Sequence, residues 1–152
     1  MGKAALVERT RALGETDTCW TGRLSAPDHV LHGGEYFTEY LYRQPRSAAE
    51  TALLVEAAEC EVFGAYGCDG DTHWTPAAVR DWWRDRGRIT RYLAQEHHDW
   101  ADDPEAVRQG VRAGIRDFAS YIDGELAIDL RVYMYWLEER RSPEPGNRLP
   151  DL

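Results

Sequence analysis

Residues 104–123 read PEAVRQGVRAGIRDFASYID, which is the most regular helical pattern in this 152-residue chain. At about 100° per residue, the apolar side chains of this segment fall on one arc and the polar side chains on the other. The apolar arc consists of Val107, Val111, Ile115, Phe118 and Ile122. The pattern therefore predicts a helix from Pro104 to about Asp123 that packs one face against a hydrophobic core.

Two further helices are predicted upstream by their start signals. Ser47 and Glu50 form a capping box, in which the Ser hydroxyl accepts from the Glu backbone N–H. Thr75 precedes Pro76, and a capping hydroxyl followed by proline at the first helical position is typical of a helix start. The first helix, running to about residue 63, is apolar almost all round, so we expect it to pass through the middle of the fold. The second runs to about residue 100, and Gly87 predicts either a kink or a break into two helices.

The downstream segment 125–139 fits two structures. Its apolar residues alternate as in a strand, but the same residues also give apolar helical faces. We prefer a buried helix, because the neighbouring segments are helical and a lone strand needs partners. The predicted fold is therefore mainly α, a bundle of about five or six helices with a long irregular N-terminal loop over 15–34. The alternative is an α+β fold with a small sheet that includes residues 126–136.

The size and composition predict one globular domain that is located in the cytoplasm. We expect residues 1–141 to form a single helical domain and residues 142–152, with three prolines and a glycine, to form a flexible tail. Three cysteines without a CxxC pair favour a reducing compartment over a disulfide framework. The absence of an apolar run of about 20 residues predicts no membrane span. A formal net charge of −9 argues against nucleic acid as the partner.

Three residues are candidates for catalysis. At its helical angle Glu56 lies among apolar residues, where an ionised carboxylate needs a partner, a proton or a metal ion. On the helix that begins at Thr75, Glu96 lies at the edge of the apolar arc and His97 lies inside it. If the two helices face each other, Glu56, Glu96 and His97 could converge on a divalent metal or form an acid/base pair. The competing interpretation is structural: Glu56 bonds a buried polar side chain, and His97 is a satisfied core histidine.

A second candidate metal site lies in the loop 64–74. Asp69, Asp71 and His73 bring two carboxylates and an imidazole together on a glycine-rich segment. Those groups suit a divalent cation. The same residues are equally typical of an ordinary surface turn.

Several residues are candidates for binding a partner. Arg108, Arg112 and Arg116, four residues apart, form a basic strip that could bind a phosphate or an acidic protein. Trp82 and Trp83 cannot both face one interior, so Trp83 could contact a partner. Charge is also segregated, because residues 47–79 contain six acidic residues and neither Lys nor Arg. Such asymmetry can orient a partner, or it can complement a neighbouring helix.

Two functional classes follow. The first is a non-catalytic interaction module, such as an acidic adaptor, an inhibitor or a small subunit of an assembly, with a protein partner or a second copy as its ligand. It is motivated by the segregated charge, the many aromatic residues and the lack of any catalytic motif such as a P-loop, GxSxG or HExxH. The second is a metal-dependent or carboxylate/histidine-dependent enzyme, or a ligand-binding helical bundle, built on Glu56, Glu96 and His97. The sequence favours the first class.

Overall fold

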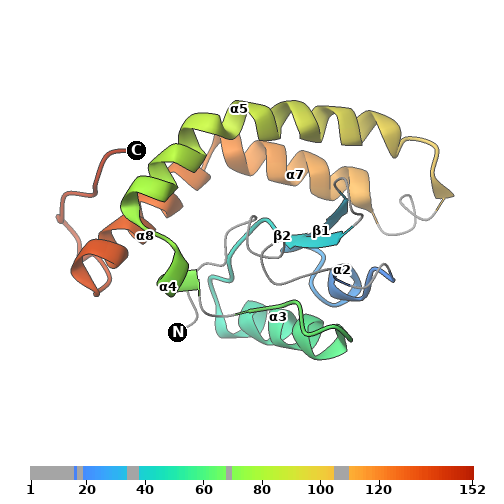
Figure 1. The fold of residues 1–152 in the computed structure, drawn as a ribbon, viewed down its shortest axis with the longest axis horizontal. Helices are drawn as coiled ribbons and strands as arrows, with labels where there is room; N and C mark the ends of the chain where they lie inside the picture. Colours follow the sequence, from blue (N-terminus) through green and yellow to red (C-terminus); the bar gives the residue numbers. More distant parts are fainter. Residues whose placement is uncertain (1–15, 17–18, 34–37, 68–69, 105–109) are drawn as a thin grey trace.

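A computed structural model of the chain describes residues 16, 19–33, 38–67, 70–104 and 110–152. The fold is mainly helical, with one small antiparallel hairpin, which confirms the predicted class. Its elements are α2 (Thr21–Ser25), β1 (Val30–Gly33), β2 (Thr38–Leu41), α3 (Ala48–Cys60), α4 (Gly70–His73), α5 (Pro76–Asp99), α7 (Val111–Asp123) and α8 (Leu126–Glu139). In Figure 1, α5 and α7 lie along one edge of the molecule and α3 lies along the opposite edge, with the hairpin between them.

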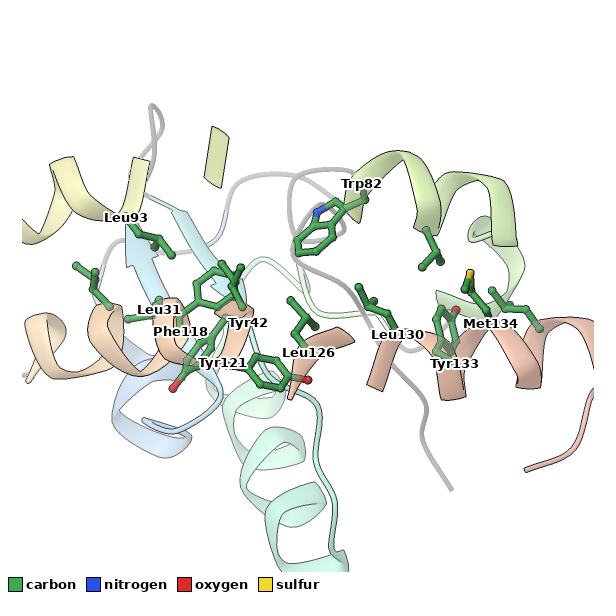
Figure 2. Close-up of a cluster of buried hydrophobic side chains, with 14 of the residues drawn as sticks. Leu31, Tyr42, Trp82, Leu93, Phe118, Tyr121, Leu126, Leu130, Tyr133 and Met134 are labelled. Atoms are coloured by element: carbon green, nitrogen blue, oxygen red, sulfur yellow. The ribbon is translucent and has the colours of Figure 1, made fainter. Parts of the chain in front are cut away.

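The main core forms where α5, α7 and α8 meet the hairpin. The described residues of the predicted arc of α7, namely Val111, Ile115, Phe118 and Ile122, are all buried, which confirms the helical pattern. Figure 2 shows the core extending from Leu93 and Phe118 at one end to Met134 at the other. Val107 of the predicted arc lies outside the described residues.

The hairpin has buried side chains on both of its faces. Val30 pairs with Leu41 and Leu31 with Tyr40 in the antiparallel register. Because successive side chains of a strand point to opposite faces, Leu31 enters the main core while Val30 enters a second cluster with Leu41 and Ala57 of α3. The hairpin thus separates two hydrophobic clusters, and the smaller one anchors α3.

The ambiguous segment 125–139 is a helix, as preferred. α8 buries Leu126, Leu130 and Leu137. The alternative sheet over 126–136 is therefore wrong, and the small sheet lies instead at the hairpin. The segment 76–99 is one continuous helix, with Gly87 exposed on its outer side. The two predicted caps are present, because the hydroxyls of Ser47 and Thr75 accept from the backbone three residues later, each at 3.2 Å.

The prediction that α3 runs through the middle of the fold is wrong. Among its residues, only Ala57 is fully buried, while Leu53 and Val55 are 40% and 51% exposed. A helix that is apolar almost all round gives no direction for burial, and among the described elements α2 and the hairpin cluster cover one side of it. An apolar helix therefore lies at the surface.

The C-terminal residues 142–152 make specific contacts with the helices. Arg131 of α8 donates from Nε to the carbonyl of Pro150 at 2.8 Å, and Arg80 of α5 donates to the carbonyl of Asp151 at 2.9 Å. The proline-rich composition that predicted a flexible tail gave no indication of these partners. Within the described residues, no helix combines the length and the apolar character needed to cross a bilayer.

Candidate functional site

The three predicted catalytic residues do not converge. Glu56 is exposed on α3, whereas Glu96 and His97 are half-buried on α5 at the opposite edge of the molecule (Figure 1). Among the described residues, no three His, Cys, Asp or Glu side chains are grouped closely enough to hold a metal ion. The geometry therefore does not bring Glu56 together with Glu96 and His97, so the condition for a shared metal site or acid/base pair, that the two helices face each other, is not met.

Glu96 connects α5 to the hairpin. Its Oε2 accepts a hydrogen bond of 2.7 Å from the indole N–H of Trp100, one turn later on the same helix. An added Cβ at Gly33, where φ is +156°, would lie 2.8 Å from Glu96 Oε2 and 2.9 Å from the hydroxyl of Tyr92. The end of β1 thus approaches α5 so closely that only glycine fits. This arrangement indicates a packing role for Glu96.

His97 is paired with an arginine of α7. Nη2 of Arg112 lies 3.4 Å from Nδ1 of His97, and because a guanidinium can only donate, Nδ1 accepts and the ring proton is on Nε2. Burial, followed by the positive charges of Arg112 and Arg116, lowers the pKa of His97 from its usual value. Nε2 is itself buried and has no hydrogen-bond partner in the described part of the chain. Burial and the neighbouring arginines therefore favour the neutral form of this half-buried imidazole, whose Nδ1 faces Arg112 of α7.

The remaining predicted residues are dispersed. Asp69 and Arg108 lie outside the described residues, as does the side chain of Asp71, while His73 is exposed at the end of α4. Arg116 is exposed on α7. Of the predicted basic strip, Arg112 therefore contacts His97, and Arg116 lies at the surface.

Trp83 is half-buried on α5. The guanidinium of Arg86 lies over its ring at 4.1 Å from the centroid and donates to its backbone carbonyl at 2.8 Å. Trp82, its neighbour, is buried in the main core. The two tryptophans do face different surroundings, as their adjacency requires, and Trp83 is covered in part by an arginine of its own helix.

The sequence predicted a buried carboxylate at Glu56. In the structure Glu56 is exposed, and a fully buried carboxylate lies instead at Glu39, on β2. Glu39 is fully buried, and its Oε1 accepts from the backbone N–H of Arg23 at 3.1 Å, in the first turn of α2. Its Oε2 accepts from the hydroxyl of Tyr66 at 2.9 Å. A Cβ at Gly22 would overlap both the Tyr66 hydroxyl and the Glu39 carboxylate, so only glycine fits here. Glu39 therefore holds α2 and the segment after α3 against the hairpin.

Arg23 is a second buried charge that the sequence did not indicate. Its guanidinium donates to the carbonyls of Pro27 at 2.6 Å, Val30 at 2.7 Å and Gly110 at 3.0 Å. An added Cβ at Gly114 would lie 2.8 Å from the guanidinium, so this glycine of α7 makes room for Arg23 rather than for another helix. Burial lowers the pKa of Arg23, and its three carbonyl partners offset the cost of burying the charge. Arg23 joins α2, β1 and α7.

The turn after α3 is fixed by another buried carboxylate. Glu61 accepts from the backbone N–H of Phe63 at 3.1 Å and from that of Ala65 at 2.7 Å. Between these bonds, Val62 and Phe63 are 75% and 67% exposed. Two large apolar side chains are thus presented to solvent on a turn whose backbone is held in place.

Together, α3 and this turn form one outward surface. At about 100° per residue, the exposed side chains of α3 share a continuous arc. We define the α3 face as Leu53, Val55, Glu56, Glu59 and Cys60 of this arc together with Val62 and Phe63 of the turn. Among the described residues, six large hydrophobic side chains are exposed, and four of them lie on the α3 face: Leu53, Val55, Val62 and Phe63. The fifth is Leu24 of α2, the helix that packs against α3. The sixth is Ile128 of α8. The feature of the sequence that could have indicated this surface is the helix after Ser47, which is apolar almost all round.

Comparison with protein-family models, with curated proteins and with solved structures finds no match to this chain. Its function is therefore argued from the geometry alone.

Proposed function

We propose that this protein is a non-catalytic interaction module, acting as an adaptor, an inhibitor or an assembly subunit, and that the α3 face binds its protein partner. The observation that carries the proposal is the concentration of exposed apolar side chains on this one surface. Single exposed apolar residues are normal on a protein surface, but four of the six exposed large hydrophobic side chains of the described residues lie on α3 and on the turn that follows it, and such a concentration supports a site of contact.

The rigidity of the turn supports the same function. Because Glu61 holds the backbone at Phe63 and Ala65, little conformational entropy remains to be lost when a partner covers Val62 and Phe63. Aromatic side chains on such fixed positions are the usual anchors of protein interfaces. The exposed thiol of Cys60 adjoins this turn at the end of α3 and can report whether the surface is covered.

A thiol-protection experiment tests the proposal. A short maleimide pulse is applied to cells that naturally make the protein and, separately, to the purified protein. Mass spectrometry then compares modification of Cys60 with that of Cys19, which is also exposed. We expect Cys60 to react several-fold more slowly, relative to Cys19, in cells than in the purified protein, because the partner covers it.

Two variants make this experiment specific. Phe63→Asp should restore the reactivity of Cys60 in cells, while Ile128→Asp, which places the same charge on the exposed apolar position of α8, should leave the protection intact. Both positions are exposed, so either change should alter the free energy of unfolding by no more than about 0.5 kcal/mol. Equal relative reactivity of Cys60 in cells and in the purified protein would refute the proposed surface.

A further inference from the structure

The α3 face carries charge of only one sign. Glu56 and Glu59 are exposed on it, and the chain has no Lys or Arg from residue 47 to residue 79. Among the described residues, neither carboxylate takes part in an ion pair. The nearest preceding arginine, Arg46, instead pairs with Glu125 and Asp129 near the start of α8, at 2.7 and 2.8 Å. On the exposed arc of α3 the two carboxylates lie between Val55 at one edge and Leu53 at the other, so the face combines apolar side chains with negative charge that nothing in the described part of the chain neutralises.

The direction of α3 adds to this negative charge. The helix ends at Cys60 beside the exposed turn, and its last turn contains no basic residue. The carboxyl end of a helix carries a partial negative charge, which a cation nearby would stabilise. Glu59 lies in this last turn, so the side chain and the helix end have the same sign.

A second copy of this chain does not suit such a surface. In a two-fold symmetric dimer each patch packs against the same patch of the other copy, so the carboxylates of Glu56 and Glu59 from both copies would enter one interface to which neither patch brings a basic side chain. Like charges brought together in an interface oppose association. The charge pattern therefore favours a different molecule with basic groups.

The shape of the same arc indicates a helix as the contacting element. Ala48 and Ala52, one turn apart, are exposed near the middle of the arc, and Ala49 lies one turn before Leu53. Small side chains one turn apart allow a second helix to approach closely, and Leu53 and Val55 at the two edges of the arc offer it apolar contacts.

We infer that the α3 face binds a helix of a different protein that carries Lys and Arg among its apolar side chains. This inference rests on the proposed function and adds the chemistry of the partner. Lys and Arg beside the contact would pair with Glu56, Glu59 and the carboxyl end of α3, while the apolar side chains of the partner would cover Phe63 and its neighbours.

A displayed peptide library tests this chemistry on the full-length protein. The peptides are 20-residue helices with a leucine face, in which the flanking positions vary freely among Lys, Glu and Gln. We expect the selected peptides to be enriched in Lys, and we expect their affinity to fall as salt screens the charges. The double variant Glu56→Gln, Glu59→Gln should weaken them about tenfold, since exposed charge pairs contribute modestly and several act together.

The control and the contrary outcomes separate the two proposals. Glu138→Gln with Glu139→Gln makes the same change of net charge on exposed positions of α8 and should leave binding unchanged. Selected peptides that are neutral or acidic, and that lose binding in Phe63→Asp, would overturn the basic partner while the proposed surface stands. Peptides whose binding is unaffected by both the glutamate variants and Phe63→Asp, or the absence of any binder, would overturn both.

Discussion

Replacing Glu39 with alanine is expected to lower the free energy of unfolding by about 2–6 kcal/mol, because it leaves two buried donors unsatisfied and each such donor costs about 1–3 kcal/mol. The change leaves the backbone N–H of Arg23 and the hydroxyl of Tyr66 without their buried acceptor. Because a domain of this kind is stable by only about 5–15 kcal/mol, such a loss should be obvious in urea denaturation. The midpoint of unfolding is the quantity to compare.

Two other variants control this result. Glu39→Gln retains an acceptor oxygen for one donor and should lose clearly less than the alanine variant. Glu56→Ala removes a carboxylate that is exposed on α3 and should change stability by no more than about 0.5 kcal/mol. If Glu39→Ala were as stable as Glu56→Ala, the buried position of Glu39 would be wrong.

Replacing Arg23 with methionine should lower the free energy of unfolding by about 3–5 kcal/mol, because its three hydrogen bonds from a charged group contribute about 1.5–3 kcal/mol each and the removal of a buried charge offsets part of that sum. Methionine fills part of the space but leaves the carbonyls of Pro27, Val30 and Gly110 without the donor that the guanidinium supplies. The same urea titration measures it.

Arg116→Met provides the matched comparison for this second change. It removes the same charge from an exposed position of α7 and should leave stability within about 0.5 kcal/mol of the unmodified protein. Equal stability of the Arg23 and Arg116 variants would show that the Arg23 guanidinium does not hold α2, β1 and α7 together.

The helices could be predicted where one face of the pattern is apolar and the other polar. In α7, Ile115 and Phe118 are buried as the spacing required, because a single apolar arc has only one way to leave water. The caps of α3 and α5 were equally predictable, since a hydroxyl at the start of a helix acts locally. These features depend on residues that are close in sequence.

The depth of α3 and the buried charges could not be predicted, because they depend on residues far apart in the chain. A helix that is apolar all round fits a core as well as a surface for a partner, and only the packing of α2 and the hairpin decides between them. Glu39 lies on β2, and its partner Tyr66 is 27 residues away in the chain. A pattern of apolar residues shows where burying a carboxylate would cost free energy. It does not show which carboxylate of the chain finds the hydrogen-bond donors that make burial possible.

The candidate site shows the same division. The sequence selected Glu96 and His97 correctly as polar groups at or within an apolar arc, and the structure gives each a neighbour, Trp100 and Arg112. These partners lie on α5 itself and on α7, so no second carboxylate from α3 is required. The α3 face, in contrast, is indicated only when the exposed side chains of a helix and of the turn after it are considered together.

Site-specific photo-crosslinking in native cells provides the decisive measurement for the α3 face. The same photoreactive amino acid is placed at Val55, which is 51% exposed, or at Ile128, which is 52% exposed, so that the two probes differ in location and hardly in accessibility. We predict a discrete adduct with a different protein from position 55, its loss in the Phe63→Asp background, and no such adduct from position 128. An adduct of two copies of this chain, a crosslink within the chain, or equal yields from the two positions would contradict the assignment of the α3 face as the surface that binds a partner protein.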